Sequence, residues 1–159
     1  MLTGGNGRRI VDAAALLEEY RTLVEQVELA PLVVSGNSMS PFLAHGRDTV
    51  YLSKVDRPLR RGDMVLYQRK NGAYILHRIC GVRDGAFDLA GDAQTVVEHG
   101  VTRDQIFAVV RAARRKGRMQ QPGCFWWAFF EKFWVRVIPM RPVLLRVYRA
   151  LYRIFGRKI

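Results

Sequence analysis

The dipeptide Asn71-Gly72 limits the fold more than any other feature, because it stands between two runs with the composition of β-strands. Asn-Gly tolerates the positive φ angles of a tight hairpin turn. The flanking runs, 64–68 and 73–82, are rich in β-branched and aromatic residues, which favour strands. We therefore expect an antiparallel pair of strands with His77 in the second one.

Other short runs of this kind are separated by turn signals. Asp84-Gly85 predicts a tight turn, and Arg60–Asp63 predicts a turn before the strand at Met64. Further strands are expected at Leu32–Val34, Thr49–Leu52, Ala86–Ala90 and Ile106–Ala112. Many short strands with glycine-containing turns predict a mainly β fold of the α+β class, in the form of an antiparallel, partly open β-barrel or folded sheet.

The N-terminal part predicts one amphipathic helix. From Ile10 to about Leu29, apolar residues recur at helical spacing between acidic ones, and Pro31 is expected to end the helix. Met1–Arg9 is glycine-rich and polar, and we expect it to be disordered. Acidic residues interrupt the first thirty positions, so we expect neither a secretory signal nor an N-terminal membrane span.

The formal net charge of +12 is concentrated in the C-terminal third of the chain. Residues 1–110 carry 13 Lys+Arg and 13 Asp+Glu, whereas residues 111–159 carry 13 basic residues against Glu131 alone. The larger part is therefore neutral overall and needs no polyanionic partner. We divide the chain into an N-terminal tail and helix (1–30), a β body (31–115) and a basic, aromatic helical segment (116–159).

The C-terminal segment has the character of amphipathic helices. Phe and Trp dominate 124–138, and in 143–155 the residues Arg146, Arg149 and Arg153 share one helix face. The longest uncharged run is too short for a transmembrane helix. In a nucleic-acid-binding arm, aromatic residues are expected to alternate with arginines, whereas here they are clustered. We expect a peripheral contact with an anionic membrane through 124–155, at the cytoplasmic face and without a nucleic-acid partner; packing of the segment onto the body is the alternative.

Ser38 is the candidate nucleophile. It lies in the stretch Ser35–Pro41, at a turn between two apolar runs, and its hydroxyl becomes reactive only if a neighbouring base accepts the proton. His77 is the candidate base, and Asp92 in a Gly-Asp turn offers a carboxylate that would orient the imidazole. Each also has a structural interpretation, as a turn serine, a core histidine and a turn-forming aspartate.

Nothing in the sequence points to a metal or a cofactor. Cys80 and Cys124 lack the spacing of a disulfide framework or a zinc site, and we interpret both as reduced packing residues. No group of His, Cys and Asp has metal-ligand spacing. We therefore expect neither a metal site nor a cofactor.

Over roughly residues 33–110, the chain resembles the type I signal peptidase family of serine proteases. Four motifs carry the likeness and follow the family's order: Ser38-Met39-Ser40-Pro41, Arg61-Gly62-Asp63-Met64-Val65, His77-Arg78-Ile79 and Gly91-Asp92. Each is short and weak by itself, but the four together form a specific signal. The likeness is greatest to the eukaryotic and archaeal branch, in which a histidine replaces the lysine base of the bacterial enzymes.

The resemblance implies an antiparallel β fold of the signal-peptidase type and hydrolysis of a peptide bond through an acyl-enzyme. It implies Ser38 as the nucleophile and, through its backbone N–H, as the oxyanion donor. It implies His77 as the general base and Asp92 as the acid of the Gly-Asp box. The implied substrate is a precursor with a signal or leader peptide, cut after a small residue such as alanine or glycine.

Two positions depart from the family's pattern. Gly36 stands where some bacterial relatives have a hydroxyl that helps to form the oxyanion hole, and Glu98 stands near the position of a second acid. Whether Glu98 contributes to the site stays open at this point. We expect no counterpart of the family's N-terminal membrane anchor.

Two other functions are alternatives. One is a regulator related to the self-cleaving repressors, although those proteins use a lysine base and carry an N-terminal DNA-binding unit. The other is a non-catalytic, peptidase-like protein that binds a membrane or nucleic acid through its basic segment.

Overall fold

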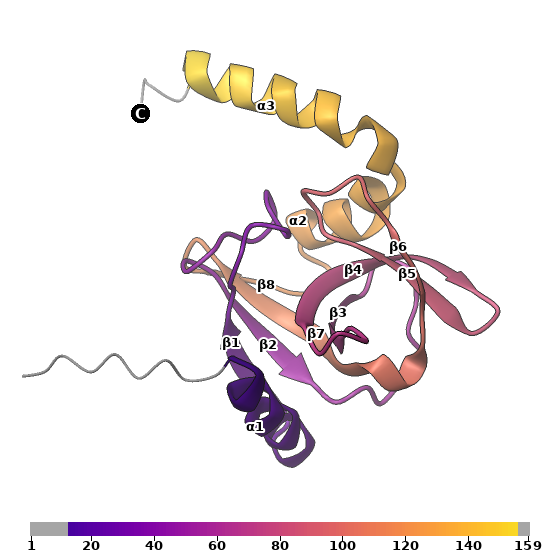
Figure 1. Ribbon diagram of the computed structural model, residues 1–159. Helices are drawn as coiled ribbons and strands as arrows, with labels where there is room; N and C mark the ends of the chain where they lie inside the picture. Colours follow the sequence, from indigo (N-terminus) through magenta and orange to yellow (C-terminus); the bar gives the residue numbers. More distant parts are fainter. Residues whose placement is uncertain (1–12, 156–159) are drawn as a thin grey trace, which may run out of the picture.

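The structure is a computed structural model that describes residues 13–155. In this range the chain forms an open, mainly antiparallel sheet of eight strands, with a short N-terminal helix and two C-terminal helices (Figure 1). The strand order is β1-β2-β7-β3-β4-β5-β6, and β8 pairs with β7. The elements of the body are α1 (Ala13–Gln26), β1 (Ala30–Val33), β2 (Thr49–Ser53), β3 (Met64–Gln68), β4 (Tyr74–Arg83), β5 (Ala86–Ala90), β6 (Glu98–Val101), the short 3₁₀ turn η1 (Arg103–Gln105), β7 (Ile106–Arg115) and β8 (Arg118–Gln120). The expected mainly antiparallel β fold is confirmed.

Two strands, β6 and β8, were not expected. The charge run around Lys116 turns out to close a hairpin between β7 and β8, in which Lys116 and Gly117 have φ angles of 49° and 75° and Arg115 pairs with Arg118. These angles match the turn type favoured in two-residue hairpins. The boundary that we expected after residue 115 therefore falls inside a hairpin of the sheet.

The N-terminal helix ends earlier than expected, and Pro31 does not end it. The helix α1 ends at Gln26, and Pro31 lies within β1, which is the edge strand of the described sheet and pairs with β2. An edge strand accepts proline because one side of it has no hydrogen-bonding partner. The expected disorder of residues 1–9 and the expected helix start at Ile10 lie outside the described residues.

The sheet buries side chains on both of its faces. In β3, Met64 and Leu66 belong to one hydrophobic cluster, the main core, whereas Val65 and Tyr67 belong to another, the second core. Side chains alternate along a strand, so a strand that is covered on both faces reads as a continuous apolar run. This arrangement explains why the sequence of β3 is almost entirely apolar. It also means that successive side chains of the neighbouring strand β4 lie on different faces of the sheet.

The C-terminal segment has two parts. The first comprises α2 (Phe125–Ala128), a π-helical turn η2 (Phe129–Phe133) and two 3₁₀ turns, η3 (Trp134–Arg136) and η4 (Ile138–Met140). Three of its aromatic residues, Trp127, Phe130 and Trp134, are only 3–6% exposed and belong to the main core. This part therefore packs onto the body, as the alternative interpretation of the segment predicted.

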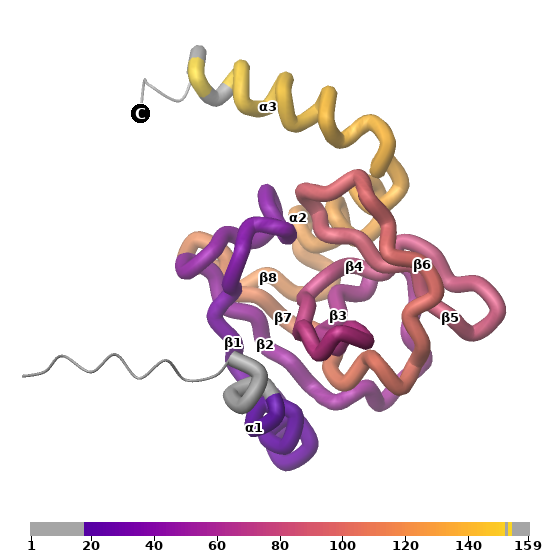
Figure 2. Tube along the Cα trace, in the orientation of Figure 1, coloured from indigo at the N-terminus to yellow at the C-terminus, as the bar shows by residue number. Residues whose placement is uncertain are grey.

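The second part is the helix α3 (Arg141–Phe155). It extends away from the sheet, at the opposite end of the molecule from α1 (Figures 1 and 2). None of the helices within residues 13–155 is long and apolar enough to cross a membrane.

Candidate functional site

Ser38 lies in a turn that the main core holds in place. The side chains of Met39, Phe42 and Leu43, which follow it, are buried in that core, and the N–H of Leu43 donates to the carbonyl of Met39 (2.9 Å). Ser38 itself is half-buried. Within the described part of the chain, neither its hydroxyl nor its backbone N–H forms a hydrogen bond. Both groups are therefore free to meet a ligand.

The turn that contains Gly91 and Asp92 packs directly on Ser38. The N–H of Ala93 donates to the Ser38 carbonyl at 2.8 Å. A Cβ atom at position 91 would lie 2.5 Å from that carbonyl oxygen, closer than non-bonded atoms approach. Only glycine fits there, so this turn positions the backbone of the candidate nucleophile.

His77 lies in β4 opposite Val65 of β3 and is only 3% exposed. Its Nδ1 is 3.4 Å from the hydroxyl oxygen of Tyr67, and that hydroxyl donates to Oε2 of Glu98 at 2.6 Å. Because the single hydroxyl proton of Tyr67 is used in this way, its oxygen can only accept from Nδ1–H. In a neutral imidazole this tautomer leaves Nε2 as the proton acceptor.

Burial keeps the imidazole neutral. The pKa of His77 is lowered to about 4, mainly by burial and also by the charge of Arg69, while the carboxylates of Glu98 and Asp92 oppose the shift. Burial acts to raise the pKa of Glu98, but hydrogen bonds from Arg69 and Tyr67 hold it below its ordinary value. Around neutral pH the site thus contains a neutral histidine beside an ionised glutamate.

Ser38 and His77, which are far apart in sequence, line one hollow. Its volume is about 170 Å³, and apolar side chains such as Val34, Met39 and Ile75 contribute to its walls. No hydrogen bond joins the hydroxyl of Ser38 to the imidazole among residues 13–155. The structure therefore brings the expected nucleophile and base into one small cavity without linking them directly.

In the described structure, the carboxylate of Asp92 forms its hydrogen bonds with Arg78 rather than with His77. It is fully buried, and both of its carboxylate oxygens accept hydrogen bonds from Arg78, at 2.9 and 2.8 Å. Arg78 also donates to the carbonyl of Gly62 (2.9 Å). The direct orienting bond that we expected from Asp92 to the imidazole is absent from the described structure, because His77 and Arg78 are neighbours in β4 and point to opposite faces.

Tyr67, Arg69 and Arg78 contribute to the site but were missed by the sequence analysis. The signal for Tyr67 lies in the hairpin register, since it is the diagonal neighbour of His77.

The N–H of Arg69 donates to the carbonyl of Ala73 (2.8 Å), so the loop of this hairpin has three residues, 70–72. A register shifted by one residue would turn every side chain of β4 to the other face.

The remaining motif residues have structural contacts. Gly62 has a φ of 99°, and Asp63 forms an ion pair with Arg57 (2.8 Å). The backbone N–H of Gly36 donates to Nδ1 of His45 at 3.0 Å. These contacts shape the loops around the site.

Cys80 and Cys124 are both half-buried and free. In the part of the chain that the structure describes, no three His, Cys, Asp or Glu side chains are grouped so as to hold a metal ion. No protein-family model matches the sequence, and the comparison with curated proteins finds no significant match.

Proposed function

We propose that this chain is a serine endopeptidase of the signal-peptidase type, which hydrolyses a peptide bond in a signal or leader peptide. One observation carries the proposal: the unbonded hydroxyl of Ser38 and the buried imidazole of His77 line the same hollow. Nδ1 of His77 is directed to Tyr67, so Nε2 is left to accept a proton. The order of the four motifs in the sequence supports the same assignment.

In the proposed reaction, the Ser38 oxygen attacks the carbonyl carbon of the scissile bond while Nε2 of His77 accepts the hydroxyl proton. The tetrahedral intermediate then collapses, the C–N bond breaks, and His77 returns the proton to the leaving amine. Water hydrolyses the resulting ester by the same proton transfers and regenerates Ser38. The backbone N–H of Ser38, which has no partner in the described structure, is the proposed oxyanion donor.

Tyr67 and Glu98 take over the orienting role in this proposal. Their hydrogen bond of 2.6 Å holds the tyrosine oxygen beside Nδ1, and the carboxylate of Glu98 stabilises the imidazolium that forms during the reaction. Asp92 acts from a distance, through its charge and through the fold of its turn. In this proposal Glu98, whose contribution the sequence left open, orients and stabilises the imidazole together with Tyr67.

The small hollow supports a substrate with a small residue before the cleaved bond. Its volume of about 170 Å³ is shared by Ser38, His77 and their apolar neighbours. Alanine or glycine at that position agrees with the specificity that the family resemblance implies.

The test uses the full chain and a proteome-derived peptide library, with new peptide ends identified by mass spectrometry. We expect cleavage after small residues, and a loss of at least about 10³-fold in rate when Ser38 is replaced by alanine. Ser40→Ala is the matched control, because the Ser40 hydroxyl already donates to the carbonyl of Leu43 (3.3 Å). Equal cleavage by Ser38→Ala would overturn the assignment of Ser38 as the nucleophile, and no cleavage by the wild-type chain would overturn the proposal in favour of a non-catalytic protein.

We also place the proposed enzyme at an anionic membrane surface as a peripheral protein. The support is the charge of the C-terminal segment together with the projecting, amphipathic helix α3 (Figure 1). This placement would bring the site close to precursors that are bound to the membrane.

A further inference from the structure

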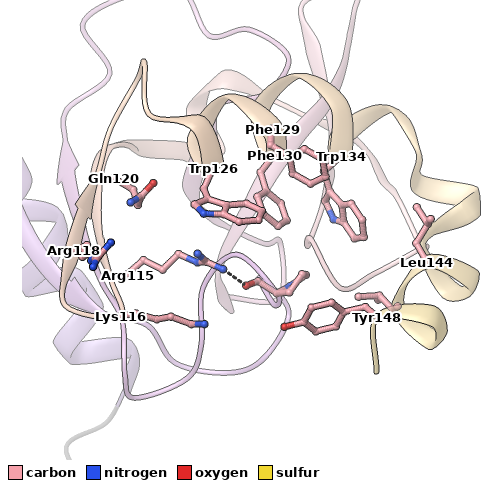
Figure 3. A pocket seen from close by; sticks show the side chains of 12 residues that line it. Arg115, Lys116, Arg118, Gln120, Trp126, Phe129, Phe130, Trp134, Leu144 and Tyr148 are labelled. Atoms are coloured by element: carbon pink, nitrogen blue, oxygen red, sulfur yellow. Dashed lines mark hydrogen bonds between the residues drawn. The ribbon is translucent and has the colours of Figure 1, made fainter. Parts of the chain in front are cut away.

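A hollow of about 580 Å³ lies between the β7–β8 hairpin and the C-terminal helices, and we call it the aromatic hollow (Figure 3). Trp126, Phe130 and Trp134 form its aromatic side, and Leu144 and Tyr148 line it from α3. Its size is within the range of roughly 300–1,000 Å³ that is typical of ligand sites, and such sites are mainly apolar with a few polar groups. The hollow is separate from the small cavity that Ser38 and His77 share.

Basic side chains of the hairpin line the same hollow. Arg115 is held in place: its Nε donates to the carbonyl of Phe42 (2.6 Å), and its guanidinium lies over the ring of Trp126. Figure 3 shows Arg115 and Lys116 reaching from the hairpin towards Tyr148. Lys116 and Arg118 are exposed. These basic residues of the β7–β8 hairpin therefore form one wall of the aromatic hollow.

These cations are not neutralised by the described part of the protein. Neither Lys116 nor Arg118 forms an ion pair with an acidic residue among residues 13–155. Asp48 accepts the backbone N–H of Lys116 (3.0 Å), but its carboxylate is paired with Arg47. A ligand at this wall would therefore meet positive charge that no acidic residue within 13–155 pairs with.

The outer side of α3 continues the apolar surface. Val143, Val147 and Leu151 recur every four residues and are 49–60% exposed. Arg146 and Arg149 lie on the neighbouring arc of the same helix and are exposed. A helix with an apolar arc beside a row of arginines is typical of segments that lie in the headgroup region of a membrane.

The aromatic hollow with its basic wall and the outer side of α3 together indicate which class of ligand binds. The ligand must be anionic, to meet Lys116 and Arg118, and it must offer an apolar chain for the aromatic hollow. A nucleic acid satisfies the first condition but would leave Val143, Val147 and Leu151 in water. An anionic phospholipid in a bilayer satisfies both conditions.

We propose that the aromatic hollow is a binding site for an anionic phospholipid: its phosphate accepts hydrogen bonds from Lys116 and Arg118, an acyl chain occupies the hollow, and the outer face of α3 lies in the bilayer surface. The site deepens the membrane placement proposed above and rests on it. It does not depend on the proposed peptidase chemistry, because binding is measured without cleavage.

The first test measures binding of the full chain to phosphatidylcholine vesicles with and without phosphatidylglycerol. We expect binding only when phosphatidylglycerol is present. The double variant K116Q/R118Q should weaken it about 30-fold, since each basic residue near an anionic surface contributes about fivefold. The double variant K54Q/K70Q removes the same charge from exposed positions elsewhere, and its loss should be well below that. Equal losses would show that only net charge matters and would overturn the site.

The second test locates the acyl chain. The three tryptophans of the protein, Trp126, Trp127 and Trp134, all lie in the C-terminal segment, and Trp126 and Trp134 line the aromatic hollow. Phosphatidylglycerol with brominated acyl chains should quench their fluorescence, and Trp126→Phe should reduce the quenched fraction. Binding without quenching would overturn the occupation of the hollow by an acyl chain.

The failures are distinguishable from one another. No binding to any vesicle would overturn the membrane placement as a whole, and polyuridylate binding that depends on Lys116 and Arg118 without vesicle binding would assign the surface to nucleic acid. Vesicle binding with the expected variant effects, but no peptide cleavage, would retain the lipid site and overturn only the peptidase.

Discussion

At the scale of single residues, the burial of His77 connects the candidate site to the stability of the protein. The folded state holds the imidazole neutral with a pKa of about 4, whereas an unfolded chain binds a proton near the ordinary pKa of about 6.5. Between these two values the unfolded state binds more protons than the folded state. The free energy of unfolding should therefore fall as the pH decreases from about 6.5 to about 4.

This effect can be measured by urea denaturation at neutral pH and near pH 4.5. From the pKa difference we expect His77 to account for a loss of about 2–3 kcal/mol over this interval. The variant His77→Asn has no proton to bind at this position, so its loss should be smaller by that amount. His45 and His99 stay in both proteins and cancel in the comparison. The same pH slope in both proteins would contradict the burial of a neutral imidazole.

The strand β4 contributes to the site from both of its faces, with His77 on one face and Arg78, the partner of Asp92, on the other. Arg78 and Asp92 form an ion pair of 2.8 Å in which both side chains are at most 1% exposed. A buried charge needs a partner of this kind because its desolvation is otherwise uncompensated. By pairing with Arg78, the Gly91-Asp92 turn is fixed beside Ser38, while the opposite face of β4 is left to His77.

At the scale of elements, the first residue of α3 connects the C-terminal segment to the site. Arg141 is buried and donates to the carbonyls of Gly91 (2.7 Å), Gln94 (2.9 Å) and Trp134 (3.1 Å). The indole N–H of Trp134 donates to the carbonyl of Asp92 at 2.8 Å. Arg141 and Trp134 thus fix the Gly91-Asp92 turn, and that turn contacts the backbone of Ser38.

Replacing Arg141 by methionine should destabilise the protein by about 3 kcal/mol, because buried carbonyl groups lose their donor. It should also lower the kcat of the proposed peptidase, since the turn at Gly91 positions the nucleophile. Arg146→Met is the matched control: the residue lies in the same helix but is exposed, and its effect on stability should stay within about 0.5 kcal/mol. Chemical denaturation measures both, and equal effects would contradict the role of Arg141.

At the scale of the whole molecule, the C-terminal segment is part of the folded unit rather than a detachable tail. Its residues Trp127, Phe130 and Trp134 share the main core with Val24 of α1 and the inner side chains of the sheet. Removing a single buried aromatic side chain typically costs about 3–5 kcal/mol, which is a large share of the roughly 5–15 kcal/mol that stabilises a domain. The helix α3 beyond Arg141 contributes less to this core.

Two truncations separate these parts. A chain that ends at residue 123 lacks all three aromatic residues and should show no cooperative thermal transition by circular dichroism. A chain that ends at residue 142 keeps them and Arg141, and it should unfold cooperatively. A cooperative transition of the shorter chain, at the temperature of the full protein, would show that the sheet folds without the segment.

Local chemistry made several features readable from the sequence. The strand Ala86–Ala90 has the expected bounds, because Asp84 and Gly85 adopt the positive φ angles that their residue types favour. The hairpin around Asn71-Gly72 was also expected and is present. Turn preferences and strand composition depend on neighbouring residues only, so a single sequence contains the information.

The strands β6 and β8 were missed for the complementary reason. They are short, and charged or glycine residues occupy much of Glu98–Val101 and Arg118–Gln120. Their backbone bonds come from pairing with β5 and β7. Tertiary pairing overrides a weak local preference.

Composition and turn chemistry established the antiparallel β class, singled out Ser38 and His77, and located the excess charge in the last third of the chain. Only the folded chain decided that Asp92 pairs with Arg78, that Tyr67 and Glu98 stand beside His77, and that the tryptophans enter the main core. The face that a strand presents depends on one residue of loop length, and the partner of a buried charge depends on packing between residues far apart in the chain. The preferences of neighbouring residues determine neither the face of a strand nor the partner of a buried charge.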